Sequence, residues 1–144
     1  MIFEVRVQEE PFDLAHDQKR LTKTGKQIGA VVSFTGLVRD APLFLEHYPG
    51  MAEVQMGAIL QEARERWPLL GAIVVHRVGQ LQAGDPIVLV LTASSHRAAA
   101  FHAAEFLMDW LKTRAPIWKK APGGWVEMKA DDDAMAARWN INEK

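Results

Sequence analysis

The sequence predicts an α+β fold with a mixed, mainly antiparallel sheet and two principal helices. Short alternating or β-branched runs, which are typical of strands, occur in several parts of the chain. Two other stretches, beginning near Ala52 and Ser95, favour long helices. These elements do not follow the strict rhythm of a parallel β-α-β fold. We expect a single domain spanning residues 1–144, because 144 residues with 49% hydrophobic content can supply one core.

The first part of the chain is expected to form a strand, a short helix and a second strand. Residues 2–8 alternate apolar and charged side chains, which favours a strand. Asp13 is expected to cap a short helix that runs to about Thr24. Residues 28–34 are a β-branched run suited to a buried strand, and the Thr-Gly pair that ends at Gly36 is expected to stop it.

The middle of the chain predicts a turn, a helix and two neighbouring strands. Residues 46–50 are expected to form a turn into a helix that begins near Ala52. Apolar side chains recur in this helix at steps of three and four, and Pro68 ends it. Residues 72–78 and 86–93 are expected to be strands joined by a turn that contains two glycines.

The last third of the chain predicts a long helix and then a hairpin. Ser94 or Ser95 is expected to cap the helix, and Pro116 forces it to end near Arg114. Beyond it we expect a hairpin formed by residues 117–120 and 125–129. A last short helix is expected to begin at the three aspartates of residues 131–133, because carboxylates favour a helix N-terminus.

Composition argues against several classes of function. The net charge of −1 disfavours nucleic-acid binding, which needs a basic surface. The chain has no cysteine and therefore no disulfide, thiolate metal site or cysteine nucleophile, so any sulfur that it handles must arrive on another molecule. The five histidines lack a common metal-ligand spacing, and we expect neither a metal nor a cofactor. With no signal sequence and no apolar stretch of roughly 20 residues, the chain is expected to be cytoplasmic, with no membrane partner.

Polar residues at the ends of elements are the first candidates for a binding site. Ser95-His96-Arg97 opens the long helix, where unpaired N–H groups and the helix dipole favour an anion such as phosphate. The alternative is a solvated Arg97 and a His96 that caps a neighbouring loop. Arg39 follows a buried strand and is suited to pointing into a cleft, or to a simple ion pair with Asp40.

A second candidate is the cation-rich segment 112–120, which spans the end of the long helix and the start of a strand. Lys112 and Arg114 have an ordinary explanation, because cations are favourable near a helix C-terminus. Lys119 and Lys120 do not share it, and since strand residues alternate, one of them is expected to face the interior or a groove. Neighbouring cations favour the neutral form of a lysine, which can act as a nucleophile or transfer protons. A fully solvated face is the alternative.

Several motifs, in a fixed order, carry a family resemblance. The runs are GAVVSFTGLVRD at 29–40, LEHYPGM at 45–51, HRVGQLQAGD at 76–85, SHR at 95–97 and FLMDWLKTRAPIWKK at 106–120. Together they resemble the large, catalytic subunit of molybdopterin synthase, over roughly residues 28–127. The motifs LEHYPGM and LKTRAP are the most specific of them.

The resemblance implies a fold, an assembly and an activity. The fold is an α/β hammerhead. The assembly is a heterotetramer in which a homodimer of large subunits holds two small ubiquitin-like carrier subunits, one at each end. The carrier's C-terminal Gly-Gly tail, which ends in a thiocarboxylate, enters a pocket of the large subunit. The activity is that of a sulfurtransferase of molybdenum cofactor biosynthesis: two sulfur transfers to cyclic pyranopterin monophosphate form the dithiolene of molybdopterin.

The resemblance also implies the site. Lys112 and Lys119 match the family's two catalytic lysines. We interpret Lys112 as the residue that stabilises the oxyanion at the carrier's terminal carbonyl and transfers protons, and Lys119 as the one that orients the substrate. Arg39, His96 and Arg97 would hold the pterin phosphate and ring, with His96 and Arg97 reaching into the pocket of the partner copy. The full implied substrate-binding set is Leu37, Val38, Arg39, His96, Arg97, Lys112, Lys119, Lys120 and Ala121.

The chain departs from the family pattern beside Arg39. Residues 41–44 join two motifs, and this connection has fewer residues than the family usually has. The resemblance therefore does not determine the shape of the substrate mouth.

Two other classes of function are weaker alternatives. A dimeric module that docks a ubiquitin-like tail without chemistry would need neither Lys112 nor Lys119. A phosphate- or nucleic-acid-binding domain would use the cations of residues 112–120, but the net charge of −1 argues against it.

Overall fold

The computed structural model describes residues 1–121, 124–125 and 139, and it contains two four-stranded sheets with three helices. The large sheet has the strand order β1-β4-β6-β2 and the small sheet the order β5-β3-β7-β8. None of the helices in this described part is long and apolar enough to cross a lipid bilayer. In chain order the elements are β1 (Phe3–Gln8), α1 (Leu14–Thr22), β2 (Ala30–Leu37), β3 (Leu43–His47), α2 (Met51–Arg66), β4 (Leu69–Arg77), β5 (Gly79–Leu81), β6 (Pro86–Ser94), α3 (Arg97–Arg114), β7 (Ile117–Ala121) and β8 (Gly124–Trp125).

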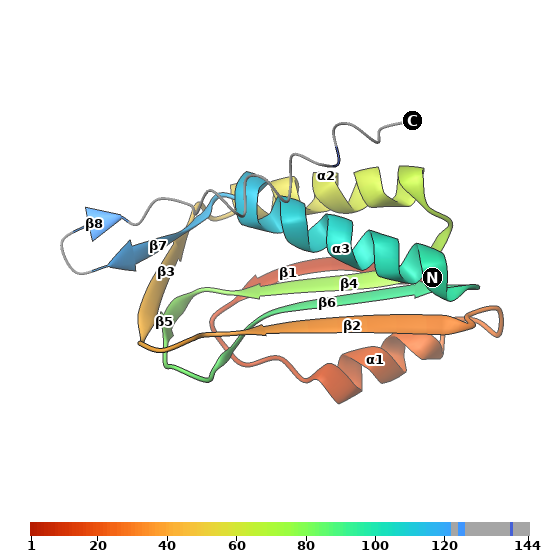
Figure 1. Ribbon diagram of the computed structural model, residues 1–144, viewed down its shortest axis with the longest axis horizontal. Helices are drawn as coiled ribbons and strands as arrows, with labels where there is room; N and C mark the ends of the chain where they lie inside the picture. The colour runs from red at the N-terminus through yellow and green to blue at the C-terminus, as the bar shows by residue number, and fades with distance from the viewer. Residues whose placement is uncertain (122–123, 126–138, 140–144) are drawn as a thin grey trace.

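The predicted mixed, mainly antiparallel sheet is confirmed. β1 and β4 are parallel, whereas every other pair of neighbouring strands is antiparallel. Helices α2 and α3 cover one face of the large sheet and α1 covers the other, while the small sheet lies at one end of the large one (Figure 1). The two longest helices are the two principal helices that the sequence predicted.

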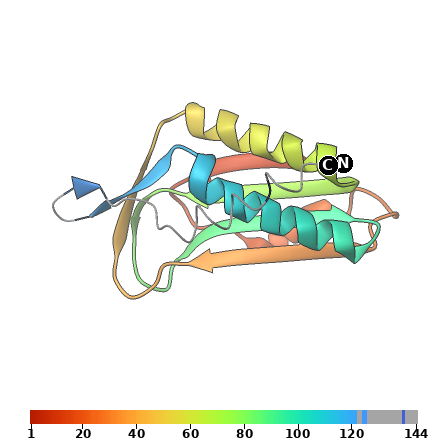
Figure 2. The same cartoon turned by 45° about the horizontal axis from the view of Figure 1, so that its top comes forward.

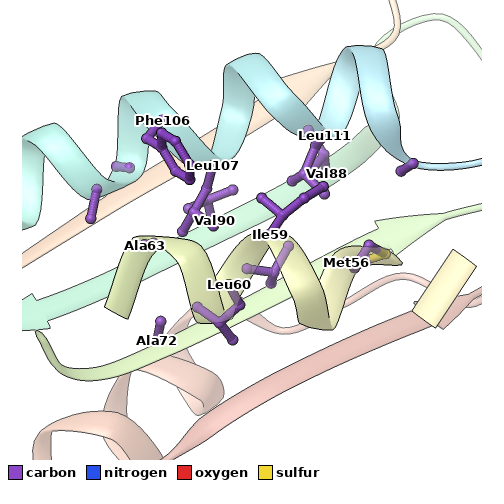
Figure 3. Close-up of a cluster of buried hydrophobic side chains, with 14 of the residues drawn as sticks. Met56, Ile59, Leu60, Ala63, Ala72, Val88, Val90, Phe106, Leu107 and Leu111 are labelled. Carbon is purple, nitrogen blue, oxygen red and sulfur yellow. The ribbon is translucent and has the colours of Figure 1, made fainter. Parts of the chain in front are cut away.

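The main core lies between the large sheet and the helix pair. Side chains of α3 such as Phe106 and Leu107 approach Ile59 of α2 above Val90 of β6 (Figure 3). Strand β4 is buried on both faces. Ala72 and Val74 face α2 and α3, whereas the alternate residues Ile73 and Val75 pack on the side of α1. A continuous apolar strand is expected where both faces of a sheet are covered, and it gives the large sheet a rigid centre.

Four charged side chains hold α1 against β1. Asp17 is 2% exposed, and the guanidinium groups of Arg6 and Arg20 lie 2.9 Å and 3.0 Å from its carboxylate oxygens. Arg20 also donates to Glu4 at 2.8 Å. Burial opposes ionisation of Asp17, but the hydrogen bonds from Arg6 and Arg20 outweigh it and keep the pKa of this carboxyl below its usual value. The predicted cap is also confirmed, because the Asp13 carboxylate accepts from the backbone N–H of His16.

The prediction that the Thr-Gly pair ends the second strand is wrong. β2 continues through Gly36, which pairs with Val88, and ends at Leu37. A Cβ on Gly36 would lie 2.8 Å from Cγ1 of Val88, so this glycine allows a close approach between strands.

The predicted turn at residues 46–50 is also wrong in part, because Glu46 and His47 belong to β3. A five-residue strand has too little alternation of its own to predict; it is held in place by β5 on one side and β7 on the other. For the same reason the predicted turn after β4 contains the short strand β5.

The predicted serine cap of the long helix is wrong. Ser94 ends β6 and donates its hydroxyl hydrogen to the carbonyl of Pro68, and His96 is the N-cap residue. The predicted hairpin is confirmed where β7 pairs with β8, Lys120 opposite Trp125. The rest of that hairpin and the start of the predicted last helix, at residues 131–133, lie outside the described residues.

Candidate functional site

The small sheet brings Lys119 next to the end of the core. Lys119 in β7 pairs with Leu45 in β3, so both side chains lie on the same face of the small sheet. Leu45 is 4% exposed and belongs to an apolar cluster with Val38, Val78 and Leu81. Lys119 itself is exposed, so its cation lies where this apolar cluster meets solvent.

Lys120 lies on the opposite face of the small sheet. Its Nζ is 3.5 Å from a carboxylate oxygen of Glu46, which gives this lysine an ion-pair partner. The expected alternation of Lys119 and Lys120 is therefore confirmed. Both side chains are exposed, so neither faces the interior, and the alternative that one of them faces a groove stays a prediction. Strands β7 and β8 extend beyond the C-terminal end of α3, in agreement with this exposure (Figure 2). For Ala121 the described residues give the backbone pairing with Gly124.

Lys112 reaches the same end of the molecule from above. It lies in the last turn of α3, and this end of the helix faces the small sheet (Figure 1). The helix stops at Arg114 because Pro116 cannot continue it, and the chain turns into β7 within a few residues. The Lys112 side chain is exposed. Lys112 and Lys119 are therefore carried by consecutive elements that meet at one place.

The third candidate segment, Leu37–Val38–Arg39, leaves β2 at this end as well. Val38 is buried; its N–H donates to the carbonyl of Asp85 at 2.9 Å, and its own carbonyl accepts from Gly84 at 2.8 Å. This double attachment fixes the backbone just before Arg39, whose side chain is exposed. Leu37 is 56% exposed and adds an apolar surface beside it. Among the ion pairs of the described part of the chain there is none between Arg39 and Asp40.

His96 and Arg97 do not join these residues within one chain. They lie at the N-terminal end of α3, whereas Lys112 lies near its C-terminal end (Figure 1). A helix rises about 1.5 Å per residue, so roughly 22 Å of α3 separates Arg97 from Lys112. Both side chains are exposed, and His96 makes no side-chain capping hydrogen bond. One copy of the chain thus carries two separate groups of basic residues, one at each end of α3.

His76, a half-buried histidine near the end of β4, is a candidate that sequence reasoning treated as structural. His76 in β4 has its Nδ1 2.8 Å from the carbonyl oxygen of Arg77, which confirms the predicted hydrogen-bonded sheet histidine. The pKa of His76 is lowered to about 4, mainly by burial and to a smaller extent by electrostatic repulsion from Lys112 and His47. The imidazole is therefore uncharged near neutral pH. The one available signal in the sequence was a titratable residue in an otherwise apolar strand.

One hollow lies away from all of these residues. It is a broad, shallow depression along the outer side of α1, between Phe12 and Thr22. Its walls carry neither a histidine nor an arginine, and it offers no chemistry that the cationic end of the molecule does not offer better.

Known proteins similar to this chain agree on one family. The model of the MoaE protein family matches residues 7–114. The "molybdopterin synthase catalytic subunit" of Mesorhizobium japonicum is 53% identical, covering 97% of this chain and 95% of that protein, and its namesake in Pseudomonas aeruginosa is 50% identical, covering 94% and 97%. The alignment with the Mesorhizobium protein spans 151 positions, more than the 144 residues of this chain, so that relative carries residues with no counterpart here.

Solved structures lead to the same family. Molybdopterin cofactor biosynthesis protein E from Burkholderia multivorans superposes with a TM-score of 0.89 at 47% identity, covering 98% of this chain and 99% of that one. Molybdopterin synthase from Staphylococcus aureus superposes with a TM-score of 0.76 at 34% identity, covering 84% and 95%. These similarities confirm the predicted hammerhead fold. The chain therefore belongs to the MoaE protein family, the molybdopterin synthase catalytic subunits, as its sequence motifs predicted.

Proposed function

We propose that the chain transfers sulfur from the C-terminal thiocarboxylate of a small ubiquitin-like carrier to cyclic pyranopterin monophosphate, and so forms the dithiolene of molybdopterin. The observation that carries this proposal is that Arg39, Lys112 and Lys119 come from three separate segments that meet at the small-sheet end of the molecule. Both reactants are anions, and a cluster of cations is what would attract and hold them.

The lysines suit the charge changes of the reaction. When the carrier's sulfur has bonded to the pterin, water must attack the carrier's acyl carbon, breaking the carbon–sulfur bond and leaving a carboxylate on the carrier. The carbonyl oxygen becomes an oxyanion during this attack, and Lys112 is the cation proposed to stabilise it and to move protons. Lys119, at the edge of the apolar cluster around Leu45, would orient the pterin and the half-sulfurated intermediate. Arg39 would hold the phosphate.

A second copy of the chain would supply the missing cations. Packing α3 against α3 of a second copy in an antiparallel arrangement brings the partner's N-terminal end, with His96 and Arg97, to the Lys112 end. The side of the molecule that would meet is apolar, since Phe101 of α3 is 53% exposed and Phe34 of β2 is 41% exposed. β2 is also the last strand of the large sheet as described. We therefore propose a homodimer with two shared sites, each taking one carrier.

The remaining predicted partners and location follow from the same proposal. Leu37 and Ala121 would line the mouth of the site, whereas Val38 is buried beside it and Lys120 lies on the opposite face of the small sheet. The short link Val38–Pro42 would leave that mouth more open than in relatives with a longer one. Cytoplasmic location stays a prediction.

The test is reconstitution from purified parts. The chain is incubated with thiocarboxylated carrier and cyclic pyranopterin monophosphate, and the dithiolene product is detected. We expect Lys112→Ala and Lys119→Ala each to lower the rate by about 100-fold at an unchanged melting temperature. Lys19→Ala, an exposed lysine on α1, is the matched control and should react normally. Carrier binding without any product in the unaltered protein would instead favour a docking module, and near-normal rates in both lysine variants would contradict the assigned roles.

A further inference from the structure

Arg77 is a buried cation at the end of β4. The residue is 7% exposed, and an arginine is buried in this way only where its donors find acceptors. Nε and Nη2 both donate to the carbonyl of Glu9, at 3.1 Å and 2.9 Å, and Nη1 donates to the carbonyl of Pro86 at 3.0 Å. Within residues 1–121, 124–125 and 139, the acceptors of this guanidinium are therefore main-chain oxygens.

The three hydrogen bonds join neighbouring strands where the large sheet meets the small one. β4 lies between β1 and β6 in the strand order. Glu9 directly follows β1, and Pro86 is the first residue of β6. Arg77 is the last residue of β4, and β5 of the small sheet begins at Gly79 (Figure 1). Arg77 thus fixes both neighbouring strands at the end of the large sheet that faces the proposed site.

The turn that precedes Pro86 is closed by its own hydrogen bonds. The carboxylate of Asp85 accepts from the N–H of Gln82 at 2.8 Å, and the N–H of Asp85 donates to the carbonyl of Gln82 at 3.0 Å. Asp85 is joined to Pro86 by a peptide bond. A turn closed in this way moves as one unit, and its position depends on where Arg77 holds Pro86.

This turn holds the segment that carries Arg39. The N–H of Val38 donates to the carbonyl of Asp85 at 2.9 Å, and the carbonyl of Val38 accepts from the N–H of Gly84 at 2.8 Å. The backbone bends sharply directly afterwards, where Asp40 has a φ of 66°. A residue other than glycine keeps such a φ where the surrounding structure holds it. The attachment of Val38 to the turn therefore determines the direction in which Arg39 leaves the sheet.

We propose that Arg77 is a positioning residue of the sulfur-transfer site, which holds Arg39, through the turn at residues 82–85, where its guanidinium meets the substrate's phosphate. This role rests on the proposed function. β2 ends at Leu37, so no strand pairing fixes the backbone of Arg39, and its position has to come from the turn. A lysine could not replace Arg77, because a single ammonium on a flexible stem lacks the planar fork that bonds two carbonyls at once.

Hydrogen exchange of two backbone amides tests this attachment without any substrate. In Arg77→Lys we expect the N–H groups of Val38 and Gly84, which join the turn to the segment, to exchange at least about 10-fold faster than in the unaltered protein. Arg20→Lys is the matched control, because it removes a guanidinium that bonds Glu4 at 2.8 Å beside α1, and it should leave both amides unchanged. Unchanged exchange in folded Arg77→Lys would overturn the proposal.

Steady-state kinetics separate positioning from a general loss of stability. If Arg77 acts through Arg39, Arg77→Lys should raise the KM for cyclic pyranopterin monophosphate about 10-fold and leave the KM for thiocarboxylated carrier little changed. In the Arg39→Ala background the same substitution should have no further effect on the pterin KM, because the group that it positions is gone. Equal changes in both KM values, or a full further loss in the double variant, would contradict the proposed role.

A second variant covers the case in which Arg77→Lys does not fold. Asp85→Ala opens the turn by removing the acceptor of the Gln82 N–H, and it leaves Arg77 in place. It should speed exchange at Val38 and raise the same KM, and normal values of both would overturn the proposal. Absence of product with the unaltered protein would count against sulfur transfer instead, and the exchange rates would still show whether Arg77 holds the turn.

Discussion

Lys119 of β7 and Leu45 of β3 are cross-strand neighbours in the small sheet, one exposed and the other buried. The apolar partner is anchored in the cluster that also holds Val38, the residue before Arg39. A single cluster therefore sets the backbone positions of two of the proposed site cations.

Leu45→Ala is expected to weaken both stability and catalysis. Removing a buried leucine side chain costs about 2–5 kcal/mol in free energy of unfolding, which urea denaturation measures. Phe44→Ala is the matched control: Phe44 lies on the opposite face of the same strand and is partly exposed, so its loss should cost less. Sulfur transfer should fall further in the Leu45 variant than in the Phe44 variant, at a temperature where both are folded. Equal effects would argue that the cluster does not hold the site.

Mixing two inactive variants is expected to restore activity if each site is shared between copies. Arg97→Ala and Lys112→Ala damage opposite ends of α3, so a mixed dimer contains one site with both defects and one with neither. Random exchange of subunits should return about a quarter of the wild-type sites. The measurement is dithiolene formation after the two purified variants are unfolded and refolded together. Activity that stays at the level of the separate variants would mean that Arg97 acts within its own chain or not at all.

Stability should depend on pH through His76. In the unfolded chain the pKa of His76 is near its ordinary 6.5, and in the folded protein it is about 4. Between these values the unfolded state binds more protons, so the free energy of unfolding should fall as the pH is lowered from 6.5 towards 4, by up to about 1.4 kcal/mol per pH unit. Urea titrations of the wild type and of His76→Gln should diverge in this window. Parallel curves would show that the histidine is not held neutral.

The carboxyl groups of Glu4 and Asp17 should affect stability at a lower pH than His76 does. The guanidinium of Arg20 holds the pKa of Glu4 below its ordinary 4.5, and Asp17 is likewise lowered from 3.8. Both carboxylates stabilise the folded protein at a pH above their ordinary pKa values. This contribution to the free energy of unfolding is lost as the pH falls through their lowered pKa values, in the wild type and in His76→Gln alike.

The sequence predicted those features that local chemistry decides. Pro68 and Pro116 end helices because a ring without an N–H cannot continue them, and Asp13 caps because a carboxylate accepts from the first turn. The predictions that were wrong concern residues whose conformation depends on contacts with residues far away in the sequence. Gly36 continues a strand because Val88 approaches it, and Ser94 bonds to Pro68 instead of capping a helix.

The same contrast between local chemistry and long-range contacts applies to the candidate site. The motifs identified the cations one at a time, but no spacing along the chain reveals that the segment of Arg39 ends beside those of Lys112 and Lys119, because Arg39 is far from both lysines in sequence. From the sequence, His76 was interpreted as structural because its strand is largely apolar, and the charges that act on its ring come from Lys112 of α3 and His47 of β3, which are distant in sequence.

The order of strands in the large sheet also bears on how the chain folds during synthesis. Within the large sheet, β1 and β2 are synthesised before the strands with which they pair, β4 and β6. β1 has no partner until the chain has been synthesised through Arg77, and β2 has none until it has been synthesised through Ser94. In this interval chaperones or aggregation would compete for the two segments.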